Sequence, residues 1–468
     1  MANGAARWTL YEAALLVLCA VLVSWQLFLP PSLGVADNND FPKLIGRFCL
    51  GPDSPQHHIL FDYVTFRYRH DPSYCWNSGL ISSAALPLHV ALQVGKVVLP
   101  AGRFDLRLLG GVYALLFLVA FNGLQRLARG LRSPTRWLLP AVALLIFGSA
   151  SYVPLFDSFY FDTAAYVFLL LSSVGICWLV LSPQVRWREY LLTAGCVILF
   201  ATAKSQHAAL AFMMLPCFWR SFGRAEFPGR PLRILATAAI VLAVGAMLIL
   251  PPRWYQSVAT YNALFYQCLP RSQDARADLA QLGLDPALSS YVGQHAFSEG
   301  TPMQHPGMIE EFGHQVPLYK MVAYYLSHPR VSALVFLDGM EEGALQRVRM
   351  KIGQREYRLG NYAKAAGQPP EAQSGFLDVW SQLKVAALGN RPIAYLAYVI
   401  GLQILLWALV LRQPADLRPR TATLAAALMG MLALAPIIVM FDAVDTGRHL
   451  FLFNALLDVA VCAIVSLV

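Results

Sequence analysis

Charged residues are scarce in this sequence. Asp, Glu, Lys and Arg make up 13% of its 468 residues, whereas a soluble domain usually has about 25%. Hydrophobic residues make up 57% of the chain, and long apolar runs recur along it. A helix of about 20 apolar residues crosses the roughly 30 Å of hydrocarbon in a bilayer. The composition therefore excludes an ordinary soluble enzyme and predicts an all-α polytopic membrane protein in contact with the lipid bilayer.

The chain also lacks the short motifs of soluble nucleotide and hydrolase chemistry. No P-loop, GxSxG, HExxH or dinucleotide fingerprint occurs, and the 8 cysteines form no CxxC pair or zinc-type Cys/His spacing. No internal sequence repeat is visible, which argues against transporter folds built on inverted repeats. Cys49 and Cys75 fall on the predicted outer side of the membrane, where disulfides persist. Whether these two cysteines pair stays open.

Ten apolar segments predict a bundle of about ten transmembrane helices with both termini in the cytoplasm. They are 10–29, 107–125, 136–153, 160–181, 190–203, 207–219, 232–250, 391–411, 421–440 and 448–468. Two of them, 190–203 and 207–219, are kept separate because a single long helix would place Lys204 at mid-membrane, at a cost of about 2.5–3.5 kcal/mol. The run 80–99 contains Pro87 and Lys96 and is interpreted as an interfacial or re-entrant helix. Whether it crosses the membrane stays open.

Basic residues are distributed unevenly among the turns. Arg-rich turns occur at 126–136, 186–188, 220–233 and 412–420, and short loops rich in Lys or Arg remain in the cytoplasm. Asp, Lys and His occur in the other turns, at 37–40, 156–162, 203–207 and 441–449. The second set is therefore expected to gather on the outer face. The formal net charge of +9 serves to orient the chain, and no nucleic-acid partner is predicted.

Two long segments lie on the predicted outer side. The predicted parts are an N-terminal transmembrane module (1–250) with its first extracytoplasmic loop (30–106), an extracytoplasmic helical loop domain (251–390) and C-terminal transmembrane helices (391–468). Within the loop domain, the run 318–337 contains Pro329, and a proline disfavours a helical conformation of the residue before it. We therefore expect two helices that meet at Ser327 to Pro329.

Four carboxylates stand in the first two of these outer turns. Asp37 and Asp40 follow the first span, where a carboxylate can take a proton from an acceptor hydroxyl or hold a divalent cation such as Mg²⁺ or Mn²⁺. The alternative is a polar loop that solvates a helix end. Asp157 and Asp162 flank Tyr160 in the next outer turn, and all three are candidates for substrate binding. The alternatives are an N-cap role for Asp162 and an interfacial aromatic belt for Tyr160.

Cationic candidates come from two further turns. Lys204 ends a helix that is apolar on all sides, and an ionisable residue within the membrane is a functional candidate by default; snorkelling to the interface is the alternative. Arg448 stands beside His449, and the planar fork of an arginine suits phosphate oxygens. A local ion pair with Asp445 is the alternative for Arg448. Further substrate-binding candidates in these turns are Gln206, His207 and Asp445.

The order of these segments resembles the GT-C superfamily of integral-membrane glycosyltransferases. Within that superfamily it resembles the bacterial glycan-biosynthesis hexose transferases described as WsfD-like. The resembling segments are DNNDFPKLIGRF (37–48), FDLRLLGGVYALL (104–116), FDSFYFDTAAYVFLLL (156–171), ATAKSQHAAL (201–210), YYLSHP (324–329), LGNYAK (359–364) and DTGRHLFLFNALLD (445–458). The family pattern usually has Glu where this chain has Asp162.

The resemblance implies transfer of a sugar, expected to be a hexose, from a polyprenyl-phosphate donor to a cell-surface glycan or lipid-linked acceptor. The reaction would occur on the outer face of a bacterial cytoplasmic membrane, with no cofactor beyond a divalent cation. By the same resemblance, Asp40 is the expected base, Asp37 assists it or binds metal, and Lys204, Arg448 and His449 bind the donor phosphate. Asp40 is expected within about 15 Å of Lys204 and Arg448, so that one phosphosugar can bridge them.

Two other functions stay open at this point. The chain could be a transporter or flippase of lipid-linked sugars, which would need the cations but no essential acid at the outer surface. It could also be a non-catalytic membrane subunit of a glycan-assembly complex.

Overall fold

The computed structural model describes residues 9–54, 58–182, 184–219, 229–305, 307–344, 349–352, 355–441 and 443–468. Within the predicted turns, residues 220–228, which include Arg220 and Arg224, and Asp442 lie outside the described residues.

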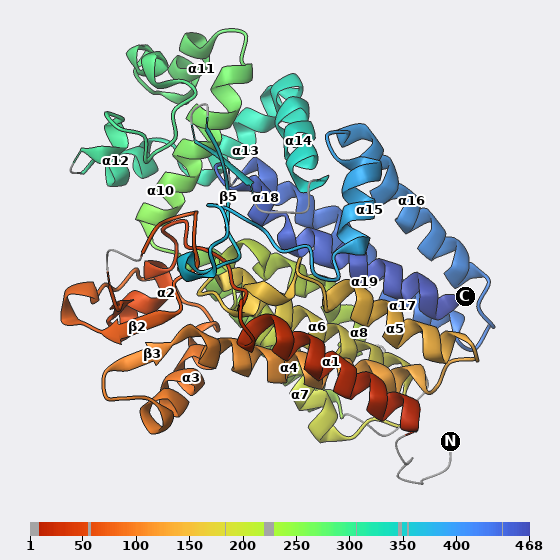
Figure 1. The fold of residues 1–468 in the computed structure, drawn as a ribbon. Helices are drawn as coiled ribbons and strands as arrows, with labels where there is room; N and C mark the ends of the chain where they lie inside the picture. The colour runs from red at the N-terminus through yellow and green to blue at the C-terminus, as the bar shows by residue number, and fades with distance from the viewer. Residues whose placement is uncertain are drawn as a thin grey trace.

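Long apolar helices form the body of the molecule (Figure 1). Within the described ranges, seven helical segments are long and apolar enough to cross a membrane. They are α1 (Leu10–Phe28), α4 (Leu106–Ala128), α6 (Phe161–Leu181), α9 (Arg230–Ile249), α16 (Pro392–Leu411), α17 (Arg418–Leu434) with the 3₁₀ turn η11 (Ala435–Met440), and α18 (Thr446–His449) with α19 (Phe451–Leu467). This arrangement confirms the all-α polytopic class.

The other three predicted spans are shorter or irregular helices. α5 (Thr135–Phe147) ends at the C-cap Gly148, before the predicted end at 153, and Val153–Phe156 forms the separate 3₁₀ turn η4. α7 (Trp187–Ala201) is followed by the 3₁₀ segment η5 (Ser205–Met214) and the short helix α8 (Leu215–Trp219). The helical path therefore breaks at Lys204, between α7 and η5, where the sequence predicted a turn.

The segment predicted to lie at the interface forms α3 (Ala85–Val98), which has 14 residues. It packs against α4 and the strand β3 (Arg103–Asp105). A helix of that length rises only about 21 Å, so it is shorter than the hydrocarbon thickness of a bilayer.

A small sheet organises the first loop. β2 (Arg67–His70) lies between β1 (Leu50–Pro52) and β3, and both pairings are antiparallel. Short helical turns accompany the sheet: α2 (Pro42–Ile45), η1 (Gly46–Phe48) and η3 (Pro72–Tyr74). A disulfide joins Cys49 to Cys75, so this pairing, which the sequence left open, is present.

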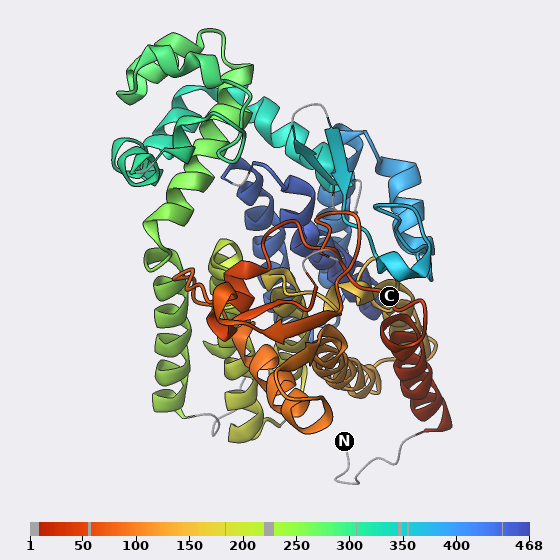
Figure 2. The ribbon, with the colours of Figure 1, turned by 60° about the vertical axis from the view of Figure 1, so that its left-hand side comes forward.

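After α9 the chain forms a helical arm, which Figure 2 shows rising from the end of that helix. Its elements are α10 (Arg253–Tyr261), η6 (Asn262–Cys268), η7 (Leu269–Arg271), α11 (Ala275–Leu282), η8 (Pro286–Tyr291), η9 (Pro302–Gln304), α12 (Met308–Gln315), α13 (Leu318–Ser327) and α14 (Pro329–Ala344). The arm has its own hydrophobic cluster, which includes Tyr261, Phe265 and Phe312. α13 ends at Ser327 and α14 begins at Pro329, which confirms the predicted break.

The chain returns from the arm to the bundle through a hairpin and a short helix. The elements are β4 (Arg349–Ile352), β5 (Arg355–Arg358), η10 (Lys364–Ala366) and α15 (Val379–Leu388). Leu33 forms an isolated antiparallel bridge with Tyr362, so the return segment lies against the first loop. The division of the chain into three parts stays a prediction.

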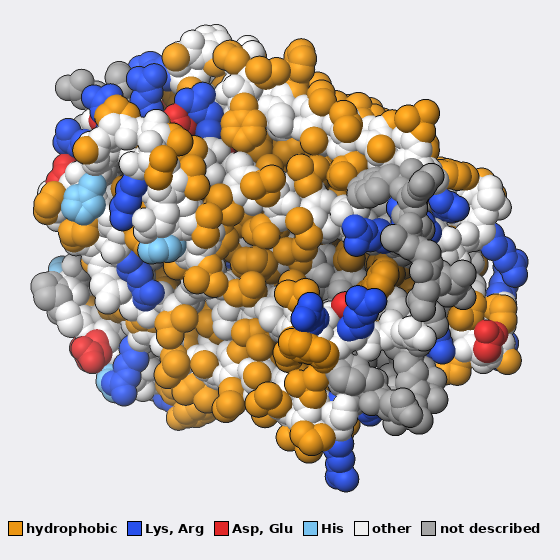
Figure 3. Space-filling view, turned by 90° about the horizontal axis from the view of Figure 1, so that it is seen from below, with side chains coloured by type: hydrophobic (Ala, Val, Ile, Leu, Met, Phe, Trp, Pro, Cys, Tyr) orange, Lys and Arg blue, Asp and Glu red, His pale blue; other side chains and the backbone are white. Residues whose placement is uncertain are grey.

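Hydrophobic side chains cover most of the middle of one face of the molecule (Figure 3). Several transmembrane helices expose large apolar residues, and on α9 these include Leu235, Leu242 and Ile249. Exposed apolar residues along a helix of this length are expected where the helix faces lipid. The outer surface of the bundle is therefore built to contact acyl chains.

Candidate active site

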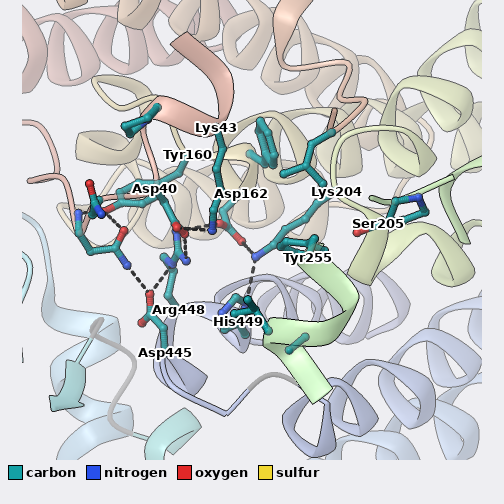
Figure 4. Close-up of a pocket in the computed structure, with 18 of the residues that line it drawn as sticks. Asp40, Lys43, Tyr160, Asp162, Lys204, Ser205, Tyr255, Asp445, Arg448 and His449 are labelled. Atoms are coloured by element: carbon teal, nitrogen blue, oxygen red, sulfur yellow. Dashed lines mark hydrogen bonds and ion pairs between the residues drawn. The ribbon is translucent and has the colours of Figure 1, made fainter. Parts of the chain in front are cut away.

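A cavity of about 530 Å³ lies where the first loop, α6, η5, the arm and α18 meet. Asp40, Lys204 and Arg448 all line it, and Figure 4 shows them pointing toward one another. Its wall also includes apolar side chains from the end of α9, among them Met247 and Leu250. Segments from the two ends of the chain thus contribute to a single pocket that combines charged and apolar surfaces.

Asp37 shapes the turn that carries Asp40. The Oδ1 atom of Asp37 accepts hydrogen bonds from the backbone N–H groups of Asn39 (2.8 Å), Asp40 (3.0 Å) and Phe41 (3.1 Å). Its Oδ2 atom lies 3.2 Å from Nε2 of His58. Asp37 is buried and does not line the cavity. Its geometry matches the polar-loop alternative, and its assignment as an assisting acid stays a prediction.

Asp40 stands between two cations. Its carboxylate forms ion pairs with Lys43, one turn further along, and with Arg448 of α18. Burial raises the pKa of Asp40, but the charges of Lys43 and Arg448 outweigh this effect and hold the pKa below its ordinary value. In this arrangement Asp40 is ionised and is a weak base, because both of its oxygens are stabilised by positive charge.

Arg448 connects three carboxylates. In addition to its ion pair with Asp40, Arg448 places its Nε atom 2.6 Å from Oδ2 of Asp445 and its Nη1 atom 3.8 Å from Oδ2 of Asp162. The guanidinium carbon lies 4.5 Å from the ring centroid of Tyr160. The local pair with Asp445 is therefore present, but it is part of a larger network. Tyr160 is buried beneath the guanidinium, which excludes a place for it in a lipid-facing aromatic belt.

Lys204 is buried beside the same network. Its Nζ donates to Oδ1 of Asp162 at 2.8 Å and to Nδ1 of His449 at 3.0 Å. Only 5% of Lys204 is exposed, which excludes the snorkelling alternative. Asp162 lies in the first turn of α6 and its side chain makes no cap, because Tyr160 occupies the N-cap position. Asp162 is shorter than the Glu of the family pattern, and Lys204 holds its carboxylate by the hydrogen bond described above.

Asp445 is the most weakly satisfied acid of the network. Its Oδ2 atom accepts from Nδ2 of Asn38 at 2.8 Å, whereas its buried Oδ1 atom has no hydrogen-bond partner among the described residues. Burial raises the pKa of Asp445 to about 7, against the opposing effect of Arg448. Near neutral pH this carboxyl is therefore partly protonated.

Besides Asp37, three candidates lie outside the cavity. Asp157 is fully buried against α4, where a Cβ placed on Gly110 would lie only 1.9 Å from its Oδ1 atom. Burial raises the pKa of Asp157 well above its ordinary value. Gln206 and His207 follow Lys204 in η5 but do not line the cavity, although Nε2 of His207 lies 3.9 Å from Oδ1 of Asp162. No substrate contact is assigned to these three residues, because the fold directs their side chains into the protein interior.

The residues predicted to bind a divalent cation do not fit that role. Three backbone N–H groups occupy one oxygen of Asp37, and two positive charges already flank Asp40. Across the described ranges, no group of three or more His, Cys, Asp or Glu side chains is arranged to hold a metal ion. We therefore derive no step through Mg²⁺ or Mn²⁺.

Several cavity residues were missed by the sequence analysis. Lys43 pairs with Asp40, and Asn38 holds Asp445. The spacing of Asp40 and Lys43 in DNNDFPK was a usable signal, because residues three apart in a helical turn face each other. Trp254 and His295 of the arm also line the cavity, and no sequence pattern distinguishes them from other loop residues.

Comparison with known proteins identifies the family. A family model described as the YfdI N-terminal transmembrane domain matches residues 5–468. The chain belongs to this family. Membership of the YfdI transmembrane family agrees with the apolar helices described above, and the closer resemblance to WsfD-like transferases stays a prediction.

Other comparisons are more distant. Among solved structures, the chain is similar to the arabinofuranosyltransferase AftD from Mycobacteria, with 13% sequence identity and a TM-score of 0.30. That match covers 96% of this chain and 28% of AftD, so the chain spans less than a third of the length of that protein. No curated protein matches the chain.

Proposed function

We propose that this YfdI-family protein is a GT-C-type glycosyltransferase that moves a sugar from a polyprenyl-phosphate donor to a glycan or lipid-linked acceptor on the extracytoplasmic side of the membrane. The observation that carries the proposal is the convergence of Asp40, Lys204 and Arg448 on one cavity whose wall also includes apolar residues of α9. Such a cavity suits a ligand with an anionic phosphate and an apolar tail. The disulfide between Cys49 and Cys75 supports an oxidising, outer location for the first loop.

The charges in the cavity suit a phosphodiester. Among the described lining residues, Asp40, Asp162 and Asp445 face Lys43, Lys204 and Arg448. When Asp445 is protonated the set has one excess positive charge, which matches the single negative charge of a polyprenyl-phosphate sugar. Lys204 and Arg448 would then hold the phosphate oxygens, with Arg448 acting as a planar fork.

Donor binding would also free the base. Arg448 pairs with Asp40 in this structure, so a phosphate that draws Arg448 toward itself removes one of the two cations that weaken Asp40 as a base. Asp40 then takes the proton from the acceptor hydroxyl, and the acceptor oxygen attacks the anomeric carbon with inversion. The bond from that carbon to the phosphate oxygen breaks, and Lys204 and Arg448 stabilise the departing polyprenyl phosphate, which is the stage at which preorganised charge lowers a barrier most.

Substitution of Asp40 tests this mechanism. We expect Asp40→Asn to reduce sugar transfer by about 10²–10⁴-fold, the usual contribution of a general base, because an amide cannot accept the proton. The measurement is transfer from radiolabelled polyprenyl-phosphate hexose by the full chain in proteoliposomes that contain bacterial glycolipid. Asp53→Asn, a change elsewhere in the first loop that does not touch the cavity, is the matched control. Transfer by Asp40→Asn at the wild-type rate would remove the assigned base, and donor movement across the bilayer without transfer would indicate the flippase alternative.

A further inference from the structure

One wall of the cavity is aromatic and comes from the outer segments. Trp76 of the first loop, Trp254 and Tyr255 of α10, and Phe297 of the arm all line it. Trp76 and Phe297 are exposed, at 45% and 63%. These four side chains, called here the aromatic wall, have no part in the proposed handling of the donor phosphate.

Contacts with the first loop hold the wall in place. Nε1 of Trp254 donates to the backbone oxygen of Ser78 at 3.0 Å, and the ring centroids of Trp76 and Trp254 lie 5.9 Å apart. The backbone N–H of Trp76 donates to the oxygen of Gly46 at 3.0 Å, and Trp76 directly follows Cys75 of the disulfide. The rings are therefore oriented before any ligand binds, which reduces the ordering cost of binding.

The wall lies close to Asp40. Lys43 forms an ion pair with Asp40, and its Nζ atom also lies 5.7 Å from the ring centroid of Tyr255. The side chain of Lys43 thus connects the proposed base to the aromatic wall. A molecule packed on the wall can present a hydroxyl group to Asp40.

His295 adds an unused hydrogen-bond donor. Its Nδ1 atom accepts from the backbone N–H of Phe297 at 3.1 Å, so Nδ1 carries no proton. Because Nδ1 accepts, the ring proton lies on Nε2, and burial lowers the pKa of His295. Nε2 is buried and has no hydrogen-bond partner in the part of the chain that the structure describes. Because an unpaired buried donor is destabilising, a ligand oxygen at this wall would gain a favourable partner.

We infer that the aromatic wall and His295 form the acceptor-saccharide subsite, in which sugar rings pack on Trp254 and Trp76 and a sugar oxygen accepts from His295. The apolar C–H face of a pyranose suits an aromatic ring, and its hydroxyl groups suit polar partners at the rim. The alternative is an interfacial aromatic belt. Belt residues face lipid, whereas these side chains line the cavity. This inference rests on the proposed function and names the substrate that the second half of the cavity takes.

Binding of simple glycosides tests the subsite. The full chain in nanodiscs of phosphatidylethanolamine and phosphatidylglycerol is titrated with methyl glycosides of glucose, galactose, mannose and rhamnose, followed by saturation-transfer NMR. We expect at least one glycoside to bind, and Trp254→Ala and His295→Leu each to weaken it by about tenfold, as for truncation of a central binding residue. Trp254→Phe and His295→Gln, which keep a ring and a donor, should retain most of the affinity. Trp25→Ala on lipid-exposed α1 and His89→Leu on α3 are the matched controls.

Two results would overturn the inference. One is the absence of binding by every glycoside to the wild-type protein. The other is unchanged glycoside affinity in Trp254→Ala. A loss of thermal stability in that variant without a loss of affinity would indicate the interfacial-belt alternative. A parallel titration with undecaprenyl phosphate keeps the two proposals apart. If substitution of Arg448 weakens undecaprenyl phosphate binding while substitution of Trp254 leaves glycoside binding unchanged, only the subsite is wrong. If substitution of Arg448 leaves undecaprenyl phosphate binding unchanged, the proposed donor site is wrong.

Discussion

Two buried Asp–Lys pairs of this protein have the same N–O distance but different surroundings. Asp162 and Lys204 lie 2.8 Å apart at the cavity, and Asp458 and Lys384 lie 2.8 Å apart between α19 and α15. All four side chains are almost fully buried. Burial of a charge within an apolar bundle therefore does not by itself indicate a functional site.

The difference lies in how completely each pair is satisfied. Both oxygens of Asp458 accept from Lys384, and they also accept from Nε1 of Trp380 (2.7 Å) and the hydroxyl of Tyr152 (2.5 Å). That network is closed and lines no part of the active-site cavity. The Asp162–Lys204 pair instead borders a cavity and adjoins Asp445, one oxygen of which has no hydrogen-bond partner among the residues that the structure describes. A closed network holds helices together, whereas an open one leaves room for a ligand.

The largest expected effect separates the two pairs by stability. Lys384→Met should reduce the free energy of unfolding by about 3–5 kcal/mol, because it leaves the buried Asp458 carboxylate without its counter-charge. Thermal unfolding in detergent measures this loss. Lys364→Met, at an exposed position of η10, is the control. An unchanged unfolding temperature for Lys384→Met would mean that the closed network does not stabilise the bundle.

The next largest effect is on activity, and it concerns the network at the cavity. Arg448→Lys should reduce transfer by about 10²–10³-fold, which is typical of removing one donor that stabilises developing charge, because an ammonium cannot form the bidentate contact with phosphate. The unfolding temperature should change little. Arg253→Lys, outside the cavity, is the control, and steady-state kinetics with the polyprenyl-phosphate hexose is the measurement. Equal transfer by Arg448→Lys and wild type would contradict the role of Arg448.

The disulfide tests how far the open network depends on the first loop. Replacing Cys49 and Cys75 together by Ser should cost about 2–4 kcal/mol, since the bond closes the loop that follows Asp40. The loss should appear as faster proteolysis of the first loop and as weaker transfer, while the Asp458 network keeps the helices assembled. Replacing Cys19 and Cys217, which are buried and not disulfide-bonded, provides a comparison. Transfer that survives full reduction would show that the loop holds Asp40 without the bond.

The smallest effect concerns pH and Asp445. Because folding raises the pKa of Asp445 to about 7, the folded protein binds this proton more tightly than the unfolded chain, so its stability falls as the pH rises from about 4 to 7. Above pH 7 the added negative charge should weaken binding of the phosphodiester donor several-fold. Asp445→Asn should make donor binding less dependent on pH between 6 and 8. A wild-type affinity that does not change across this range would exclude Asp445 as the titrating group.

Much of the fold followed from apolar periodicity and proline. The long spans, the break at Lys204 and the junction at Pro329 were predictable, because each depends on local composition and on the cost of burying charge. The gathering of Asp40 and Arg448 was predictable as well, since loops on one side of a bundle share a surface. The shortened helix α5 was not, because the 3₁₀ turn at Val153–Phe156 depends on packing against α1 and α4.

Some properties of the candidate site also could not be predicted from local sequence. Asp37 and Asp40 are chemically identical and three residues apart. Asp37 accepts hydrogen bonds from three backbone N–H groups, whereas Asp40 faces the cavity. Asp157 and Asp162 also differ, because only Asp162 lines the cavity, whereas Asp157 is buried against α4. Rotamers and the position of a distant α18 decide these outcomes, and no local pattern encodes them.

By itself, the sequence determined that the chain is a polytopic membrane protein and which turns carry ionisable groups, because hydrophobicity and charge act on each segment independently. Only the tertiary structure decided which acids are structural, which Lys–Asp pair is closed, and that Lys43 and His295 border the cavity. Those properties depend on distances between segments far apart in the chain, where a shift of one ångström makes or breaks a hydrogen bond.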